Sequence, residues 1–292
     1  MSIAWTRRRM AYGRFWKSFR SQRAGMAGLG VLVVAVVLAL IAPLFIDESV
    51  TSVVQGTGER LAPPGSGHLL GTDESGRSIL AMIWWGSRTS LLIGFLAALL
   101  SMVIGTVFGI AAGHFRGWIG AVLMRITDWF LVLPSLVTAL VLAAILGGST
   151  WTIITAIGVT SWAGTARLIR AQTLAVEARP YIERSTALGG GHWHITTRHV
   201  LPNVAPLLLA STTLEVASAI VTESTLAFLG VSANKTSWGT MLRGSYDWGA
   251  ATSGAWWYVL VPGLCIVSVV MAFTLCGRAL ETVLNPRLRR AG

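Results

Sequence analysis

Long apolar runs alternate with shorter polar segments along the whole chain. An α-helix rises about 1.5 Å per residue, so about 20 apolar residues are needed to cross the roughly 30 Å hydrocarbon layer of a membrane. Two runs, residues 24–46 and 89–113, contain no charged residue. Four further runs are also largely apolar: residues 129–146, 151–166, 204–231 and 256–277. Of these, the run 151–166 is short and the run 204–231 carries two glutamates. The pattern predicts an all-α membrane protein with six transmembrane helices and both termini on one side.

The charged residues predict the orientation. Only 12% of residues are charged and 53% are hydrophobic, whereas about a quarter of a soluble domain is charged, so lipid is the expected main solvent. The net charge of +11 would also suit nucleic acid. With cytoplasmic N and C termini, however, most of the 23 basic residues lie inside, as in membrane proteins generally. We therefore expect a membrane-lipid environment and no nucleic-acid partner. The basic residues left outside are Arg60, Arg77, Arg88, Lys235 and Arg243.

Two parts are expected along the chain. Residues 1–85 comprise a basic N-terminal segment, the first helix and an external loop, and residues 86–292 form a five-helix core with a cytoplasmic loop at 178–203. The N-terminal segment suits an anionic membrane surface, although a solvated tail fits equally well. Pro134, inside the third apolar run, removes a backbone hydrogen bond and predicts a kink there.

Small residues recur at every fourth position of the second predicted helix. Gly105, Gly109 and Gly113 continue the series that begins at Ser101, and this spacing places them on one helix face. Such a face lets another helix approach closely in a membrane. The partner helix is expected either in the same chain or in a second subunit.

The segment between the fourth and fifth predicted helices, residues 167–201, is polar, basic and longer than thirty residues. Residues 181–189 read as a short helix that ends at Gly189, a residue able to take the left-handed conformation after a helix. A second short segment then leads to Pro202, which suits the first turn of the next helix. We call residues 178–203 the knob, and expect it to face the cytoplasm.

The knob resembles the EAA loop of permease subunits in binding-protein-dependent ATP-binding-cassette (ABC) importers, with Glu183, Gly189 and Leu201-Pro202 at the family's spacing. Where the family has two small residues after the glutamate, this chain has Arg184 and Ser185. Further motifs are similar to the oligopeptide and dipeptide permease subfamily, and the resemblance covers about residues 68–287. These further motifs are His68-Leu69-Leu70-Gly71-Thr72-Asp73 with Gly76-Arg77, Leu123-Met124-Arg125 with Asp128 and Pro134, Ala166-Arg167-Leu168, Glu223-Ser224, Phe228-Leu229-Gly230 and Ser237-Trp238-Gly239.

The resemblance implies a permease of the bacterial cytoplasmic (inner) membrane that forms half of a path for peptides. It implies four kinds of partner: a homologous second permease subunit, two cytoplasmic ATPase subunits, an extracytoplasmic peptide-binding protein and membrane lipid. The short helix at residues 181–189 would enter a groove on an ATPase subunit and couple ATP hydrolysis to transport. The residues implied in this coupling are Tyr181, Glu183, Arg184, Ala187, Leu188 and Gly189.

No catalytic role is expected for the chain itself. Its two lysines, Lys17 and Lys235, do not follow glycine, so it has no Walker A phosphate loop. We therefore expect no cofactor in this chain, with ATP and Mg bound by the partner ATPase subunits. His192 and His194 would point about 200° apart on a helix, so no metal site is expected either. Cargo identity stays open among dipeptides, oligopeptides, glutathione and nickel complexes.

Two carboxylates in the fifth apolar run leave an alternative open. A charged side chain inside a membrane is unfavourable and usually faces a cavity or a partner. Glu215 and Glu223 are eight residues apart and point broadly to one side of a helix. They would line the translocation path and hold the amino terminus of a peptide, or form hydrogen bonds between subunits. In the alternative function, they would serve a stand-alone secondary transporter or channel.

Overall fold

The computed structural model describes residues 13, 15–52, 56, 58–65, 67–233 and 235–284. These residues contain helices and no strand, since their one β pairing is an isolated bridge between Thr72 and Ser78. The predicted all-α class is confirmed. The elements are α2 (Arg23–Phe45), η1 (Glu48–Thr51), α3 (Ile79–His114), α4 (Trp118–Val132), α5 (Ser135–Leu146), α6 (Thr150–Glu177), α7 (Pro180–Ala187), α8 (His192–Ile195), η3 (Thr196–Val200), α9 (Leu201–Phe228), α10 (Trp238–Asp247) and α11 (Trp256–Leu284).

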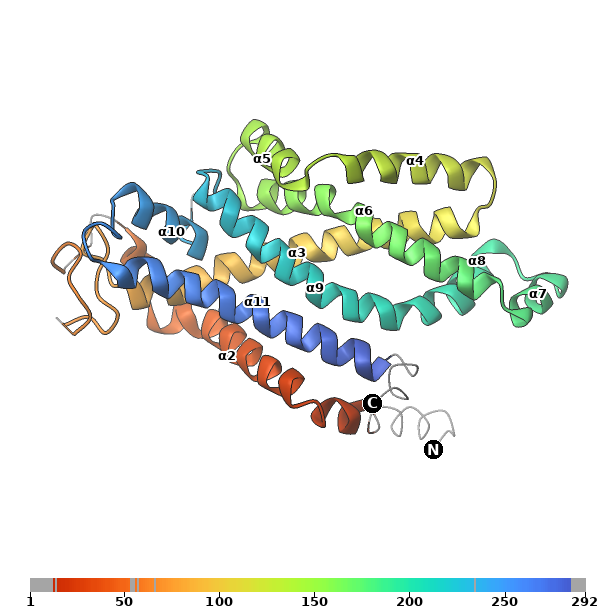
Figure 1. Cartoon of the computed structure of the whole chain (residues 1–292), viewed down its shortest axis with the longest axis horizontal. Coiled ribbons are helices and arrows are strands. Elements are labelled where there is room, and N and C mark those ends of the chain that lie inside the picture. Colours follow the sequence, from red (N-terminus) through yellow and green to blue (C-terminus); the bar gives the residue numbers. More distant parts are fainter. Residues whose placement is uncertain are drawn as a thin grey trace.

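Five helices are long and apolar enough to cross a membrane, and a sixth span exists if α4 and α5 count as one. The five are α2, α3, α6, α11 and the continuous helix His192–Phe228, which contains α8, η3 and α9. Figure 1 shows the long helices running side by side in alternating directions. The start of α2, the end of α11 and the short helix α7 lie toward one end of the bundle, and α10 lies at the other.

The third span differs from the prediction, which had a kinked helix at 129–146. The helix begins earlier, at Trp118, and is broken between Val132 and Ser135, where α4 and α5 meet at 87°. Leu133 has extended backbone angles, because the ring of Pro134 disfavours the helical conformation in the residue before it. Pro134 also lacks an N–H to continue the hydrogen-bond ladder. It therefore divides two helices where we expected a bend in one.

The fourth helix is longer than the predicted range 151–166. α6 continues from Ala166 through eleven more residues to Glu177, into the segment that we expected to be a loop. Its last three turns bury Ile169, Thr173 and Val176 although their neighbours are polar. α3 has 36 residues, a length of about 54 Å, which exceeds the roughly 30 Å hydrocarbon layer. α6 has 28 residues, a length of about 42 Å, and exceeds the layer as well. Both helices project beyond that layer at the end that carries α7 (Figure 1).

The stripe of small residues on α3 packs against α6 of the same chain. A Cβ atom added to Gly105 would lie 2.7 Å from the Thr165 Cβ, and one on Gly109 would lie 2.6 Å from the Ala166 carbonyl oxygen. One on Gly113 would lie 2.7 Å from the Thr173 Cβ. These distances are shorter than van der Waals contact, so only glycine allows the two backbones to come this close.

Parts of the predicted N- and C-terminal basic segments lie outside the described residues. These parts are residues 1–12, Arg14 and residues 285–292, which include Arg287, Arg289 and Arg290. Just before α2, Phe19 is buried beside Gly25. Gly25 and Gly28 lie directly against α11, so the first span packs on the last one through small residues.

Candidate functional site

The helix α7 is defined by signals in its own sequence. Arg179 has extended backbone angles, and Pro180 occupies the first turn, where its missing N–H has no helical partner to lose. The helix ends in a Schellman motif around Gly189, which has φ +85°. The N–H of Gly189 donates to the Thr186 carbonyl, and that of Gly190 to the Ser185 carbonyl, each at 2.9 Å. The short helix predicted at 181–189 is found at Pro180–Ala187, and the predicted left-handed glycine follows it at Gly189.

An apolar cluster fixes α7 to three long helices. Ile182 is the one residue of α7 that is buried, and it packs into a cluster contributed by α3, α6, α8, η3 and α9. Burial of such side chains is worth about 1.5–3 kcal/mol each. The knob is therefore attached to α3, α6 and α9 through packed side chains. The other members of the cluster are Ile110, Ile169, Val176, Ile195, Val200 and Val204.

Of the residues predicted for coupling, four lie on α7 and two follow directly after it, and none belongs to this cluster. All six are exposed to solvent: Tyr181, Glu183, Arg184, Ala187, Leu188 and Gly189. Leu188, at the tip, is 89% exposed, and Trp193 beyond the turn is 80% exposed. Sequence reasoning missed Trp193, although an isolated large apolar residue in a polar loop is a usable signal. Leu188 lies outside the candidate membrane spans, whereas Trp193 lies in the first turn of the span His192–Phe228.

A polar clamp around Asn203 joins the two halves of the knob. Its amide oxygen accepts a hydrogen bond from Arg179 Nη1 at 3.2 Å. Its amide nitrogen donates to the His199 carbonyl at 2.7 Å and to the Tyr181 hydroxyl at 3.5 Å. The clamp therefore ties the start of α7 to the start of α9. Sequence analysis did not identify Asn203, because two of its three partners, Arg179 and Tyr181, are more than twenty positions away.

A second contact joins α8 to the ends of α3 and α6. His114 forms a hydrogen bond through Nδ1 with the Glu177 carboxylate, and its Nε2 lies 2.9 Å from His192 Nδ1. The rings of His114 and His192 meet edge to face, with centroids 5.0 Å apart. Of the three knob histidines considered as metal ligands, His192 is thus engaged by His114, while the ring of His194 packs on that of His199.

The two intramembrane glutamates of α9 both face α3 but differ in burial. Glu215 is half-buried, and the hydroxyls of Ser101 on α3 and Thr165 on α6 lie 3.4 Å from its Oε1. Glu223 is 3% exposed, and the Ser224 hydroxyl lies 3.4 Å from its Oε2. The hydroxyls of Ser90 on α3 and Ser237 at the N-cap of α10 also interact with this carboxylate. Their contact with cargo stays a prediction, and Glu215 is the more accessible of the two.

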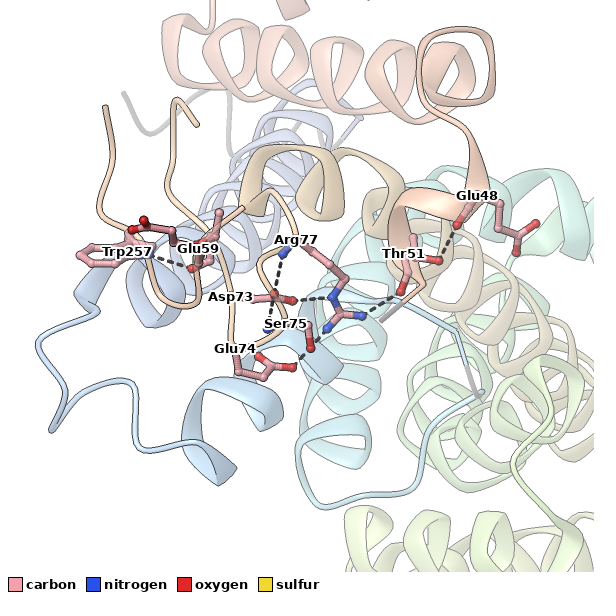
Figure 2. A network of polar contacts seen from close by, with 9 residues as sticks. Glu48, Thr51, Glu59, Asp73, Glu74, Ser75, Arg77 and Trp257 are labelled. Carbon is pink, nitrogen blue, oxygen red and sulfur yellow. Dashed lines mark hydrogen bonds and ion pairs between the residues drawn. The ribbon is translucent and has the colours of Figure 1, made fainter. Parts of the chain in front are cut away.

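The opposite end of the bundle contains a buried ion-pair network, which Figure 2 shows around Arg77. Asp73 is fully buried and accepts hydrogen bonds from the backbone N–H groups of Ser75 and Arg77, each at 2.8 Å. The Arg77 guanidinium donates to Asp73 Oδ2 at 2.6 Å, to the Thr51 carbonyl at 2.8 Å and to Glu74 Oε1 at 3.2 Å. The motif quoted above at residues 68–77 therefore closes the loop that precedes α3.

Comparisons with known proteins agree with this architecture. Residues 105–290 match the family model described as binding-protein-dependent transport system inner membrane component, and residues 12–64 match the N-terminal TM domain of oligopeptide transport permease C. The dipeptide transport system permease protein DppC of Bacillus subtilis is 36% identical over 277 residues, which cover 94% of this chain and 85% of that protein. The oligopeptide transport system permease protein OppC of the same organism is 34% identical, covering 93% of this chain and 88% of its own length.

A relative with another cargo in its name is similar over an equal length. The glutathione transport system permease protein GsiD of Pectobacterium atrosepticum is 32% identical, covering 96% of this chain and 93% of that protein. The resemblance inferred from the motifs is confirmed, as is the location in the inner membrane. The chain belongs to the family of inner-membrane components of binding-protein-dependent transport systems.

Proposed function

We propose that this chain is one permease subunit of an ATP-driven peptide importer. It would pair with a homologous permease subunit, and the translocation path would form between the two. Two cytoplasmic ATPase subunits would bind ATP and Mg and supply the hydrolysis. The names of the dipeptide and oligopeptide relatives support the peptide cargo. The observation that carries the proposal is the exposed face of α7 on a firmly anchored helix.

Coupling requires an element whose contacts differ between two states of the partner. α7 would meet this requirement by entering the ATPase groove with its exposed residues, while Ile182 and the Asn203 clamp hold it to the long helices. Closure of the ATPase subunits would push α7, and the cluster around Ile182 would pass the displacement to α3, α6 and α9. The knob end of the bundle would then be cytoplasmic, together with both termini.

The opposite end would receive cargo from an extracytoplasmic peptide-binding protein. Of the two intramembrane glutamates, Glu215 is the better placed to face the path, because it is only half-buried and its two hydroxyl contacts are long. Glu223 would act indirectly, by holding α3, α9 and α10 together through serine hydroxyls.

The proposal is tested by adding a charge at the tip of α7. We expect Leu188→Asp to lower retention of the ATPase subunits and peptide uptake at least tenfold in reconstituted complexes, because burying a lone carboxylate in a protein groove is strongly unfavourable. The matched control is Leu69→Asp, which alters a leucine that is 79% exposed near the opposite end. Both variants should unfold at the wild-type temperature, since neither side chain is packed. Wild-type ATPase retention and uptake in Leu188→Asp would contradict the coupling role.

The alternative, a stand-alone secondary transporter or channel, needs no ATPase. It is favoured only by the carboxylates inside α9, and both already have hydroxyl partners within the chain. Purified chain in liposomes, without other subunits, should move no labelled dipeptide down a gradient of pH or of the dipeptide itself. Transport at the rate of the assembled complex would establish the alternative.

A further inference from the structure

A polar cavity of about 280 Å³ lies at the end of the bundle opposite the knob. The loop before α3, the segment before α10, α10 itself and the start of α11 meet around it, and its polar lining includes Glu74, Arg77, Lys235, Thr236, Thr240 and Tyr258. Cavities for drug-sized ligands measure about 300–1,000 Å³, so this one suits a small polar molecule or the end of a larger one. No function described so far uses it.

Glu74 supplies the cavity with an incompletely bonded carboxylate. Its side chain is nine-tenths buried, and Oε1 accepts the hydrogen bond from Arg77 (Figure 2). The Tyr258 hydroxyl interacts with the carboxylate, yet the buried Oε2 completes no hydrogen bond of good geometry within the part of the chain that the structure describes. Buried acceptors are normally satisfied, so this oxygen indicates a place for an external donor.

The charges around the cavity are separated into a negative floor and a positive rim. Asp73 and Glu74 face one cation, Arg77, whose guanidinium is already bonded to both and to the Thr51 carbonyl, so one negative charge remains. Lys235 is exposed at the rim and forms no ion pair among the described residues. A simple cation would be attracted by the floor and repelled by the rim, whereas a dipolar ligand is complementary to both.

We propose that this cavity binds a small zwitterion of the amino acid or dipeptide class. Its ammonium group donates to Glu74 Oε2 and to the hydroxyl oxygens of the lining, and its carboxylate pairs with Lys235. Ammonium groups have three donors, which suits an orphan carboxylate oxygen beside threonine and tyrosine hydroxyls. Any role of this site in import rests on the proposed function; the binding itself does not.

The test is ligand binding by the full chain in lipid nanodiscs, with titrations followed by saturation-transfer NMR of three probes: glycylglycine, N-acetylglycylglycine and glycylglycinamide. Wild-type protein should bind glycylglycine roughly tenfold or more tightly than the acetylated probe, since a hydrogen bond between charged groups is lost. Glu74→Gln should abolish this preference. The matched control Glu48→Gln, an exposed carboxylate in the same external segment, should retain it.

Lys235→Met tests the other half of the ligand and alters an exposed side chain that does not threaten folding. It should abolish the preference for glycylglycine over glycylglycinamide while leaving the preference over the acetylated probe intact. Equal binding of all three probes by the wild type, absence of glycylglycine binding, or unchanged preferences in both variants would overturn the proposal. Because no transport is measured, these results are independent of whether the chain works in an importer.

Discussion

The knob end and the α10 end of the bundle are held to the long helices by different forces. At the knob, apolar side chains around Ile182 form the attachment, and the outer surface is left with an exposed leucine and tryptophan. At the α10 end, the fully buried Asp73 and its partner Arg77 fix the loop, and Trp238 and Trp257 donate to backbone carbonyls. The ends differ in the contact that anchors them and not in exposed apolar surface, since Leu69 near α10 is 79% exposed as well. The knob end also has a buried polar contact, between His114 and Glu177.

This difference indicates what each end can do. A small apolar attachment tolerates slight repacking, which suits an element that is pushed between two positions. A buried charge network has strict geometry and resists displacement, because each broken contact leaves a charge unpaired in a poorly solvated place. We therefore expect the α10 end to be the fixed end, and the knob to be the part that moves relative to its surroundings.

The largest effect is expected at the fixed end. Asp73→Ala removes the carboxylate that balances Arg77 and should lower the free energy of unfolding by about 3–5 kcal/mol, as for other broken buried ion pairs. Asp247→Ala, which breaks the half-exposed pair with Arg243, should lower it by less than about 1 kcal/mol. Thermal and denaturant unfolding in nanodiscs measure both. Equal destabilisation by the two variants would show that the buried Asp73–Arg77 pair does not stabilise its end of the bundle more than a half-exposed pair does.

The next effect concerns the attachment of α7. Ile182→Ala leaves a cavity in the cluster and should weaken the docking of α7 by about 2–4 kcal/mol. Amide hydrogen exchange should then accelerate in α7 but not in α11. Leu188→Ala, at the exposed residue that directly follows α7, should leave exchange unchanged. Uniform acceleration along the chain would show that the knob has no local stability of its own.

A smaller effect is expected from the polar clamp. Asn203→Ala removes one acceptor and two donor contacts and should cost about 1–2 kcal/mol of local stability at the junction of α7 and α9. Asn203→Asp keeps the acceptor for Arg179 and should lie between this variant and the wild type. Hydrogen exchange at residues 179–182 provides the measurement. An identical result for both substitutions would mean that the contact with Arg179 contributes nothing.

The smallest effect is expected at the end of α7. Gly189→Ala places a side chain at φ +85° and should cost about 1 kcal/mol, whereas the space around the residue is open and adds no clash. Gly191→Ala, two positions away with φ −72° and equally open space, should be neutral. Hydrogen exchange and uptake assays compare the two. Equal behaviour of the pair would show that the left-handed turn is not needed to hold the knob in shape.

Local signals explain which predictions succeeded. The short helix α7 and its left-handed Gly189 were predicted, because a proline at one end and a glycine at the other act on their own backbone. The break at Pro134 was located but underestimated. A proline identifies where a helix is interrupted, whereas the 87° angle between α4 and α5 depends on how each packs on its neighbours. The extension of α6 to Glu177 was missed because hydropathy reports the hydrocarbon layer and not the helix length.

The amino-acid sequence by itself determined the class of protein, the approximate spans and the position of the knob, because apolar run length and turn chemistry are local properties. Only the tertiary structure decided that the glycines of α3 face α6, that Glu223 is enclosed by serines, and that Glu74 lies in a polar cavity with one oxygen lacking a well-formed hydrogen bond to any described residue. Each of these depends on the relative placement of residues far apart in the chain. That placement follows from the packing of whole helices, which no short stretch of sequence specifies.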